Sequence, residues 1–215
     1  MVQPKKKFSK QTKKINYLEK FKNTKEWKIV IAPKIFEYKI IGYIINNKYT
    51  NNSGRLKEIS KRNLEVSLSE LINDYSSYYK IIKLQPYTMN KMFIRTTFNG
   101  FRLSYDFIFS MVLKPTKLVE FSIKINTLKK KVVEIFVLYT ITKNLHSNSI
   151  TYGKRSRIRK INRESILCIK KMLENKPIDF IYKICCSDVI GNSIKRRSKR
   201  VIPIKNFIIS RIKHK

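Results

Sequence analysis

Two dense clusters of basic side chains are the residues of this sequence best suited to chemistry. The clusters consist of Lys154, Arg155, Arg157, Arg159, Lys160, Arg163, Lys195, Arg196, Arg197, Lys199 and Arg200. Their ammonium and guanidinium groups are the natural donors to phosphate oxygens. Beside the first cluster lies only one acid, Glu164, so ion pairs within a helix do not account for its charge. We predict that both clusters contact phosphate, with a solvated helix face as the alternative.

The overall charge indicates the same kind of partner. Lys and Arg number 48 and Asp and Glu number 14, a formal net charge of +34. A compact chain with this surplus repels itself unless a polyanion neutralises it. Nucleic acid is favoured over an anionic membrane surface, because no run approaches the roughly 18 uncharged apolar residues of a spanning helix. A secretory signal is not expected either, because no apolar stretch follows the N-terminal lysines.

An enzymatic hypothesis depends on a few carboxylates. The best arrangement is a metal-dependent nuclease that uses Asp106, Glu120 and Glu134, with Lys124 nearby. Glu120 and Lys124 would share the solvated face of a strand, where cross-strand pairing explains them more simply. No glycine-rich phosphate cradle occurs, and we expect no enzyme activity, no cofactor and no small-molecule substrate.

Metal binding through cysteine and histidine is also not expected. Cys185 and Cys186 are adjacent, which does not fit a zinc knuckle, and the third cysteine is Cys168. The histidines are His146 and His214. We interpret the cysteines as small buried hydrophobes in a reducing compartment.

Several aromatic side chains could stack on nucleic-acid bases, but at strand positions they are more often part of a core. They are Tyr38, Tyr43, Tyr78, Tyr79, Phe98 and Phe101.

A β-hairpin is the clearest structural element of the sequence. Apolar residues alternate with polar ones over residues 119–125 and again over residues 133–141, as two half-buried strands require. Further strands are predicted at residues 27–31, 35–45, 64–68, 78–84, 92–98 and 204–212. A turn is predicted at Asn99-Gly100, followed by a helix over residues 105–114 capped by Ser104.

The basic clusters are placed on helices by their apolar spacing. Residues 154–175 form an amphipathic helix that displays the first cluster, and residues 178–185 form a second. Ser187 or Asp188 caps a third helix, which ends in the second cluster. We predict an α+β fold: a curled, barrel-like, mostly antiparallel sheet with a few peripheral helices and basic terminal arms. Residues 1–25 form a disordered basic arm. Residues 26–215 form one domain, β-rich over 26–142, helical over 154–200 and ending in the strand.

Several blocks of the sequence resemble one family in order and spacing. They are Lys25-Glu26-Trp27 with Ala32-Pro33 and Phe36, residues 64–71 with Asn73-Asp74, residues 98–103 through Asp106 to 110–112, Tyr152 before the basic helix, residues 187–191 and residues 201–204. The family is small-subunit ribosomal protein S three-a, also written e-S-one, of eukaryotes and archaea. The resemblance covers roughly residues 25 to 213, and the longer C-terminal tail of typical eukaryotic members is expected to be missing.

The resemblance implies a structural constituent of the small ribosomal subunit, on the platform near the messenger exit. It implies binding to small-subunit ribosomal RNA and to neighbouring small-subunit proteins, with a role in assembly and translation. The protein is then expected in cytoplasmic small subunits, in the cytosol or in an endosymbiont-derived compartment. A nucleic-acid-binding protein that acts outside the ribosome is the alternative function.

Overall fold

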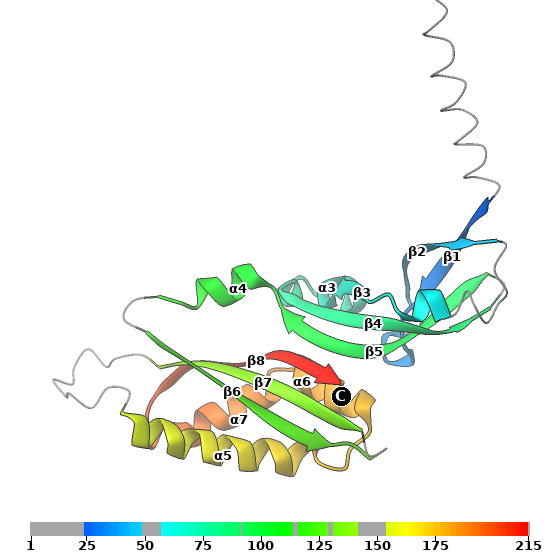
Figure 1. The fold of residues 1–215 in the computed structure, drawn as a ribbon. Coiled ribbons are helices and arrows are strands. Elements are labelled where there is room, and N and C mark those ends of the chain that lie inside the picture. Colours follow the sequence, from blue (N-terminus) through cyan, green and yellow to red (C-terminus); the bar gives the residue numbers. More distant parts are fainter. Residues whose placement is uncertain are drawn as a thin grey trace, which may run out of the picture. The chain divides into compact units, whose positions relative to one another are not determined.

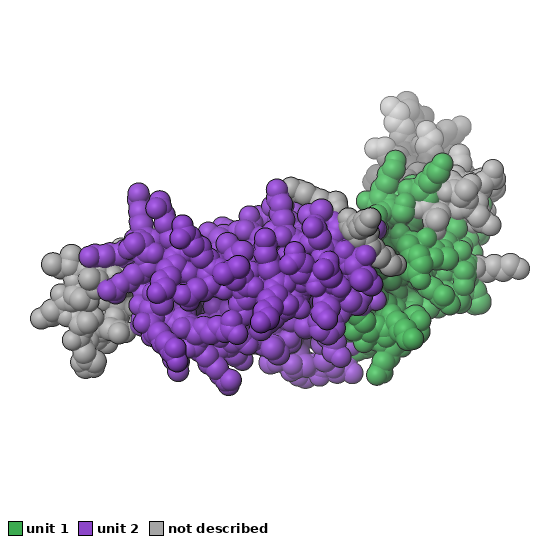
Figure 2. Space-filling view, turned by 90° about the horizontal axis from the view of Figure 1, so that it is seen from below, with its two compact units in different colours: residues 1–64, 85–97 green, residues 65–84, 98–215 purple. Residues whose placement is uncertain are grey.

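The computed structural model describes residues 24–48, 57–90, 92–113, 116–128, 131–141 and 154–214. The predicted basic arm lies outside this part of the chain except for Thr24 and Lys25, and so does His146. Packing divides the chain into unit 1, residues 1–64 and 85–97, and unit 2, residues 65–84 and 98–215 (Figure 2). These units are defined by their internal packing and are not by themselves separate domains. The single domain predicted over residues 26–215 therefore remains a prediction.

The described strands form one mixed, mostly antiparallel sheet in the order β2-β1-β5-β8-β7-β6, with β4 beside β5 and β3 beside β4 (Figure 1). Their bounds are β1 Lys25–Ile31, β2 Ile40–Asn47, β3 Leu64–Ser67, β4 Lys80–Met89, β5 Phe93–Leu103, β6 Lys117–Asn126, β7 Val132–Ile141 and β8 Ile204–His214. The predicted α+β class is confirmed, and the sheet is open because its end strands β2 and β6 do not pair with each other.

Unit 1 is built on the antiparallel pair β1–β2, with β5 parallel to β1 on the other side. Val30, Ile44, Ile59 and Ile94 form its buried core. The strand predicted over residues 35–45 is wrong at its start, where the chain forms the 3-10 helix η1, Lys34–Phe36. This turn ends because Glu37 takes a left-handed backbone with φ of 54°.

Unit 2 contains the predicted hairpin, which is confirmed. β6 pairs with β7 antiparallel from Lys117↔Ile141 to Asn126↔Val132. β7 in turn pairs with β8, so it lies between two neighbours and is buried without interruption from Val137 to Ile141. Tyr139 is fully buried there and stacks on Phe207 of β8, with ring centroids 5.8 Å apart. The hairpin therefore forms the centre of this core.

Three helices pack on the strands β6, β7 and β8 of unit 2 (Figure 1): α5 Arg155–Leu173, α6 Ile178–Cys186 and α7 Val189–Ser198. All three were predicted at nearly these bounds. The phenol of Tyr139 donates to the Asn162 side chain of α5 at 2.7 Å. On α6, Tyr182 stacks on Phe98, and its hydroxyl is 2.9 Å from His214 Nε2. These contacts hold the helices on the sheet through polar groups as well as apolar ones.

Two local predictions differ from the structure. Asn99-Gly100 is not a turn but part of β5, because the chain continues antiparallel to β8 with Gly100 opposite Lys213. A Cβ at Gly100 would lie 3.1 Å from the carbonyl oxygen of Ile212, so glycine is favoured there by the close approach of β8. The helix predicted over residues 105–114 is shorter, α4 Tyr105–Ser110, but its cap is confirmed, since Ser104 accepts from the Phe107 amide. Residues 68–72 form the short helix α3, Leu68–Ile72, after β3.

The N-terminus of α7 is anchored differently from the prediction. Asp188 occupies the N-cap position, but its side chain makes no cap hydrogen bond. Instead its carboxylate accepts from the ammonium group of Lys80 at 3.2 Å. That ammonium also donates to the Cys186 carbonyl at 2.7 Å, and the Lys80 side chain is only 7% exposed. Lys80 of β4 therefore ties the junction of α6 and α7 to the sheet.

Helix α7 approaches β8 closely at Gly191. A Cβ added there would lie 2.5 Å from the carbonyl oxygen of Phe207, which is backbone and cannot swing aside. We expect Gly191→Ala to lower the free energy of unfolding by about 1–3 kcal/mol through overpacking. The loss should appear although alanine favours a helix over glycine by about 1 kcal/mol. Urea unfolding measures this difference.

Gly42→Ala is the matched control, because an added Cβ there meets nothing within 4 Å. It should leave the stability unchanged or raise it slightly. If Gly191→Ala were as stable as the wild type, α7 would not be packed against β8 as described.

Candidate nucleic-acid interface

The first basic cluster lies on the exposed side of α5. The buried residues Ile161, Ser165, Cys168, Ile169 and Leu173 recur at helical spacing, so the opposite side of the helix faces outward. Lys154 is the N-cap residue, and Arg155, Arg157, Arg159, Lys160 and Arg163 are all exposed. The first turn of α5 has no acidic residue and no side-chain cap. Cations at this positive end of the helix are unfavourable in the free protein and favourable opposite an anion.

The second cluster lies at the end of α7. Lys195, Arg196 and Arg197 belong to its last turn, and Lys199 and Arg200 follow it. All are exposed except Lys195, which is partly buried. The negative end of a helix accommodates cations, so this cluster is better tolerated than the first.

The structure brings part of both clusters together across a groove between α5 and α7. Lys160 of α5 lines this groove with Arg196, Arg197 and Arg200. The remaining lining residues are Glu164, Leu167, Cys168, Lys171 and Val201, and the volume is about 710 Å³. The other predicted cations do not line it: Lys154, Arg155, Arg157, Arg159 and Arg163 extend along α5, and Lys195 and Lys199 lie elsewhere around α7. We call this hollow the α5–α7 groove.

One cation of the groove was missed from the sequence. Lys171 stands apart from both clusters along the chain, but it follows Lys160 by three turns of the same helix. Helical periodicity alone could have found it. The convergence with Arg197 could not be found in this way, because it depends on how α7 packs beside α5.

Three cations elsewhere in unit 2, Lys80, Lys83 and Arg102, are paired with acids, unlike those of the groove. Glu65 of β3 contacts Arg102 of β5 at 2.6 Å and Lys83 of β4 at 2.9 Å. Within the described part of the chain, none of the cations of the α5–α7 groove forms such an ion pair. Glu65 therefore holds three strands together, and the groove keeps its positive charge.

No metal centre is formed by the described residues, since no group of three or more His, Cys, Asp or Glu side chains could hold an ion. Asp106, Glu120 and Glu134, considered from the sequence for a metal-dependent nuclease, do not form such a group. Lys124 lies opposite Glu134 across β6 and β7, as the simpler cross-strand interpretation predicts, whereas Glu120 lies opposite Leu138. Burial raises the pKa of Cys186 to about 12 and that of Cys185 further, which leaves both thiols unreactive.

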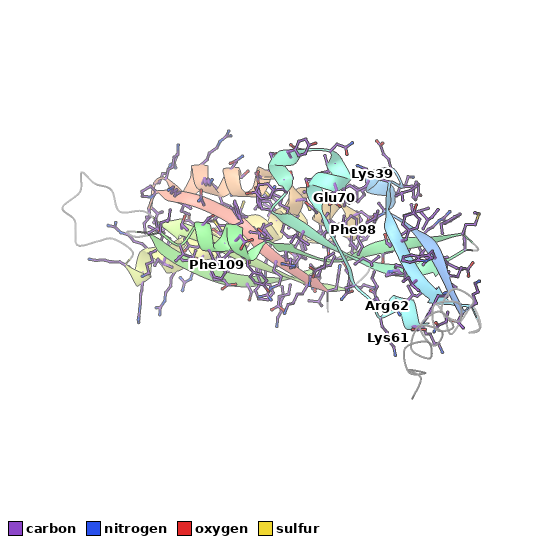
Figure 3. All side chains as sticks on the ribbon, turned by 90° about the horizontal axis from the view of Figure 1, so that it is seen from above. Lys39, Lys61, Arg62, Glu70, Phe98 and Phe109 are labelled. Atoms are coloured by element: carbon purple, nitrogen blue, oxygen red, sulfur yellow. The ribbon has the colours of Figure 1, made fainter. Side chains whose placement is uncertain are left out.

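The aromatic residues considered for base stacking fall into a buried group and an exposed group. Phe98 and Phe101 are buried, and Tyr79 stacks on Phe107 with ring centroids 3.9 Å apart, so these rings are part of the core. Tyr38, Tyr43 and Tyr78 are exposed. Figure 3 labels Phe98, which lies on β5 and is buried, and Phe109, which lies on α4 and is exposed.

The fold and the groove define a basic α+β protein whose helices present unpaired cations suited to a polyanion. The chain matches the model of the Ribosomal S3Ae family over residues 11–215 and belongs to this family. It is accordingly a protein of the small ribosomal subunit, a ribonucleoprotein component of translation, and the resemblance seen in the sequence blocks is confirmed. Proteins of such families are typically structural. None of the helices among the described residues is long and apolar enough to span a membrane.

The paired Glu65 gives the stability of unit 2 a dependence on pH. Hydrogen bonds from Arg102 and then Lys83 lower the pKa of Glu65 from 4.5 to about 2. A depressed carboxyl pKa stabilises the folded state above the unfolded value, and this contribution is lost as the pH falls toward the folded value. Glu65→Gln should cost about 1 kcal/mol above pH 4.5, since the pair is partly exposed and screened. The difference from the wild type should shrink between pH 4.5 and about 2.

Urea unfolding of both proteins over this pH range measures the difference. Glu174→Gln, which removes an exposed carboxylate at the end of α5, should stay within about 0.5 kcal/mol of the wild type throughout. A Glu65→Gln difference that does not change with pH would contradict the assigned pairing.

Proposed function

We propose that this small-subunit protein binds ribosomal RNA through the α5–α7 groove and the exposed cations of α5, and that it supports subunit assembly and translation. The observation that carries the proposal is the convergence of Lys160, Lys171, Arg196, Arg197 and Arg200 on one groove with a single acid, Glu164. Phosphates are the ligands that such a surface neutralises.

The geometry favours backbone contact over base readout. The cations come from two helices that flank a hollow, so a strand of phosphates can be contacted from both sides. Arg196, Arg197 and Arg200 can each form two parallel hydrogen bonds with one phosphate group, whereas Lys160 acts as a point charge. Binding should then depend strongly on salt and weakly on sequence.

The start of α5 provides a second contact in this proposal. The free amide groups of the first turn and the cations Lys154, Arg155 and Arg157 lie at the same end of the helix, where these cations are unfavourable without an anion. A phosphate there would satisfy the unpaired amides and neutralise Arg155 and Arg157. The unusual lack of a capping side chain at Lys154 is consistent with this role.

The groove is tested by neutralising three of its cations in one variant, Lys160→Gln, Arg197→Gln and Arg200→Gln. Affinity for a small-subunit RNA fragment should fall, because counterion release is lost with each phosphate contact. The slope of log affinity against log salt should flatten by about two to three for a duplex target. Titrations at several salt concentrations give this slope.

The control variant carries Lys124→Gln, Lys183→Gln and Lys205→Gln, which remove the same charge from exposed positions outside the groove and outside α5. Its slope should stay close to that of the wild type. Equal slopes for both variants would mean that only net charge matters and would refute the groove. A function outside the ribosome predicts instead that the tagged wild-type chain stays at the top of a gradient and does not sediment with small subunits.

The contact at the start of α5 predicts opposite effects on stability and on binding. Lys154→Asp supplies a capping side chain and a negative charge at the positive end of the helix, so the free protein should gain about 1 kcal/mol. The same change should weaken RNA binding several-fold, because it places a carboxylate beside the phosphate. Thermal unfolding and RNA titration measure the two effects.

Lys154→Ser separates capping from charge. It should give a similar gain in stability with a smaller loss of affinity. An RNA affinity that is unchanged in Lys154→Asp would place the first turn of α5 outside the RNA interface.

A further inference from the structure

The strands of unit 1 have an outer face whose side chains are largely aromatic and aliphatic. Register places Trp27 opposite Ile45, Ile29 opposite Tyr43 and, on its other side, opposite Phe93. Arg95 lies opposite Ile31 in the next row. Because side chains alternate along a strand, these residues share one face. We call it the aromatic face and define it by Trp27, Ile29, Tyr43, Ile45, Phe93 and Arg95.

The burial of β1 is the reverse of what its residue types predict. Trp27 is 63% exposed, whereas its neighbour Lys28 is 4% exposed and donates to the Asn90 carbonyl at 3.3 Å. On β2, Tyr43 is 65% exposed and the polar Asn46 is buried. Exposing large rings while burying a cation is unfavourable for folding alone. Such an inversion indicates that the rings are needed at the surface.

The charge of the aromatic face selects the kind of ligand. Arg95 is exposed, with its guanidinium carbon 5.8 Å from the centre of the Phe93 ring, and Lys25 begins the same face of β1. Glu26 alternates onto the opposite face, and no described position of the aromatic face is acidic. An acidic ligand with flat rings is complementary to such a surface. Trp27 and Tyr43, on adjacent strands and offset diagonally, have Cα atoms about 7–8 Å apart, within reach of aromatic side chains.

We propose that the aromatic face binds single-stranded RNA, with bases stacked on Trp27 and Tyr43 and the phosphates directed toward Arg95. Duplex RNA buries its base faces and could not stack there, so the ligand has to be an unpaired segment. Stacking on aromatic rings tolerates any base, which suits a surface that has few hydrogen-bond donors for base edges. This site goes beyond the α5–α7 groove and does not depend on it.

The chain contains a single tryptophan, so its fluorescence reports on this face alone. The full-length protein is first saturated with a short duplex RNA, which occupies the phosphate-binding groove, and is then titrated with single-stranded oligouridylate. Stacking of a base should quench the emission of Trp27. Tyr43→Ala should weaken this binding by about tenfold, whereas Tyr43→Phe, which keeps the ring, should bind within about twofold of the wild type.

Tyr75→Ala is the matched control, because Tyr75 is 92% exposed but belongs to unit 2. It should titrate like the wild type. Urea unfolding of Tyr43→Ala shows whether the variant is folded, and Arg95→Gln gives a second variant at the edge of the face, for which a loss of a few-fold is expected.

Three results would overturn the site: no change in Trp27 emission on adding oligouridylate, quenching that disappears when duplex RNA is present, or a Tyr43→Ala variant that binds like the wild type. Quenching by an isolated small-subunit protein but not by RNA would overturn it in favour of a protein-docking face. Unchanged duplex binding in the groove variant, with Trp27 quenching intact, would count against the proposed function alone.

Discussion

Burial of apolar stripes on the strands of unit 2 is the interaction that allows α5, α6 and α7 to carry their charge. Ile161, Ile169 and Leu173 of α5 are almost fully buried, as are Ile181 of α6 and Ile190 of α7. Each such side chain contributes about 1.5–3 kcal/mol when it leaves water. Repulsion between two exposed cations is smaller, because water and salt screen it. A cluster of positive charge can therefore remain on the outer side of the helices without unfolding them.

The same constraint explains where the scarce carboxylates lie. Glu65 links β3 to Arg102 and Lys83 on β5 and β4, and Asp188 links the buried Lys80 to the junction of α6 and α7. These acids neutralise cations where the strands and helices meet, since a buried cation without a partner would be far more costly than an exposed one. Acids on the outer side of α5 and α7 would stabilise the free helices but would compete with a bound polyanion.

Most elements of unit 2 could be predicted because each is specified by a pattern within its own residues. The alternation over residues 133–141 corresponds to β7, and the spacing of Ile161, Ile169 and Met172 corresponds to α5. The errors arise where distant strands decide the conformation. Asn99-Gly100 has the composition of a turn, but it lies within a strand, and the close approach of β8 favours glycine there. No local pattern contains the position of β8.

The α5–α7 groove was predictable only in part for the same reason. The two basic clusters were recognised as separate phosphate-binding segments, yet only Lys160, Arg196, Arg197 and Arg200 of them meet in one hollow. Their meeting depends on the packing of α7 beside α5 and against β8, where Gly191 lies close to the backbone of Phe207.

In strand β1, the pairing register buries the less hydrophobic face of the strand. Its residues Lys25 to Ile31 alternate so that Trp27, Ile29 and Ile31 would form the obvious core face, yet Lys28 and Val30 are the ones buried. A slip of one residue would exchange the two faces completely. The observed register is held by β5, where the Ile29 amide donates to the Met92 carbonyl at 3.1 Å, and by the irregularity between Val30 and Ile31 opposite β2. This register buries the less hydrophobic face of β1, and the buried Lys28 donates to the Asn90 carbonyl. The rings of Trp27 and Tyr43 therefore remain exposed at the surface.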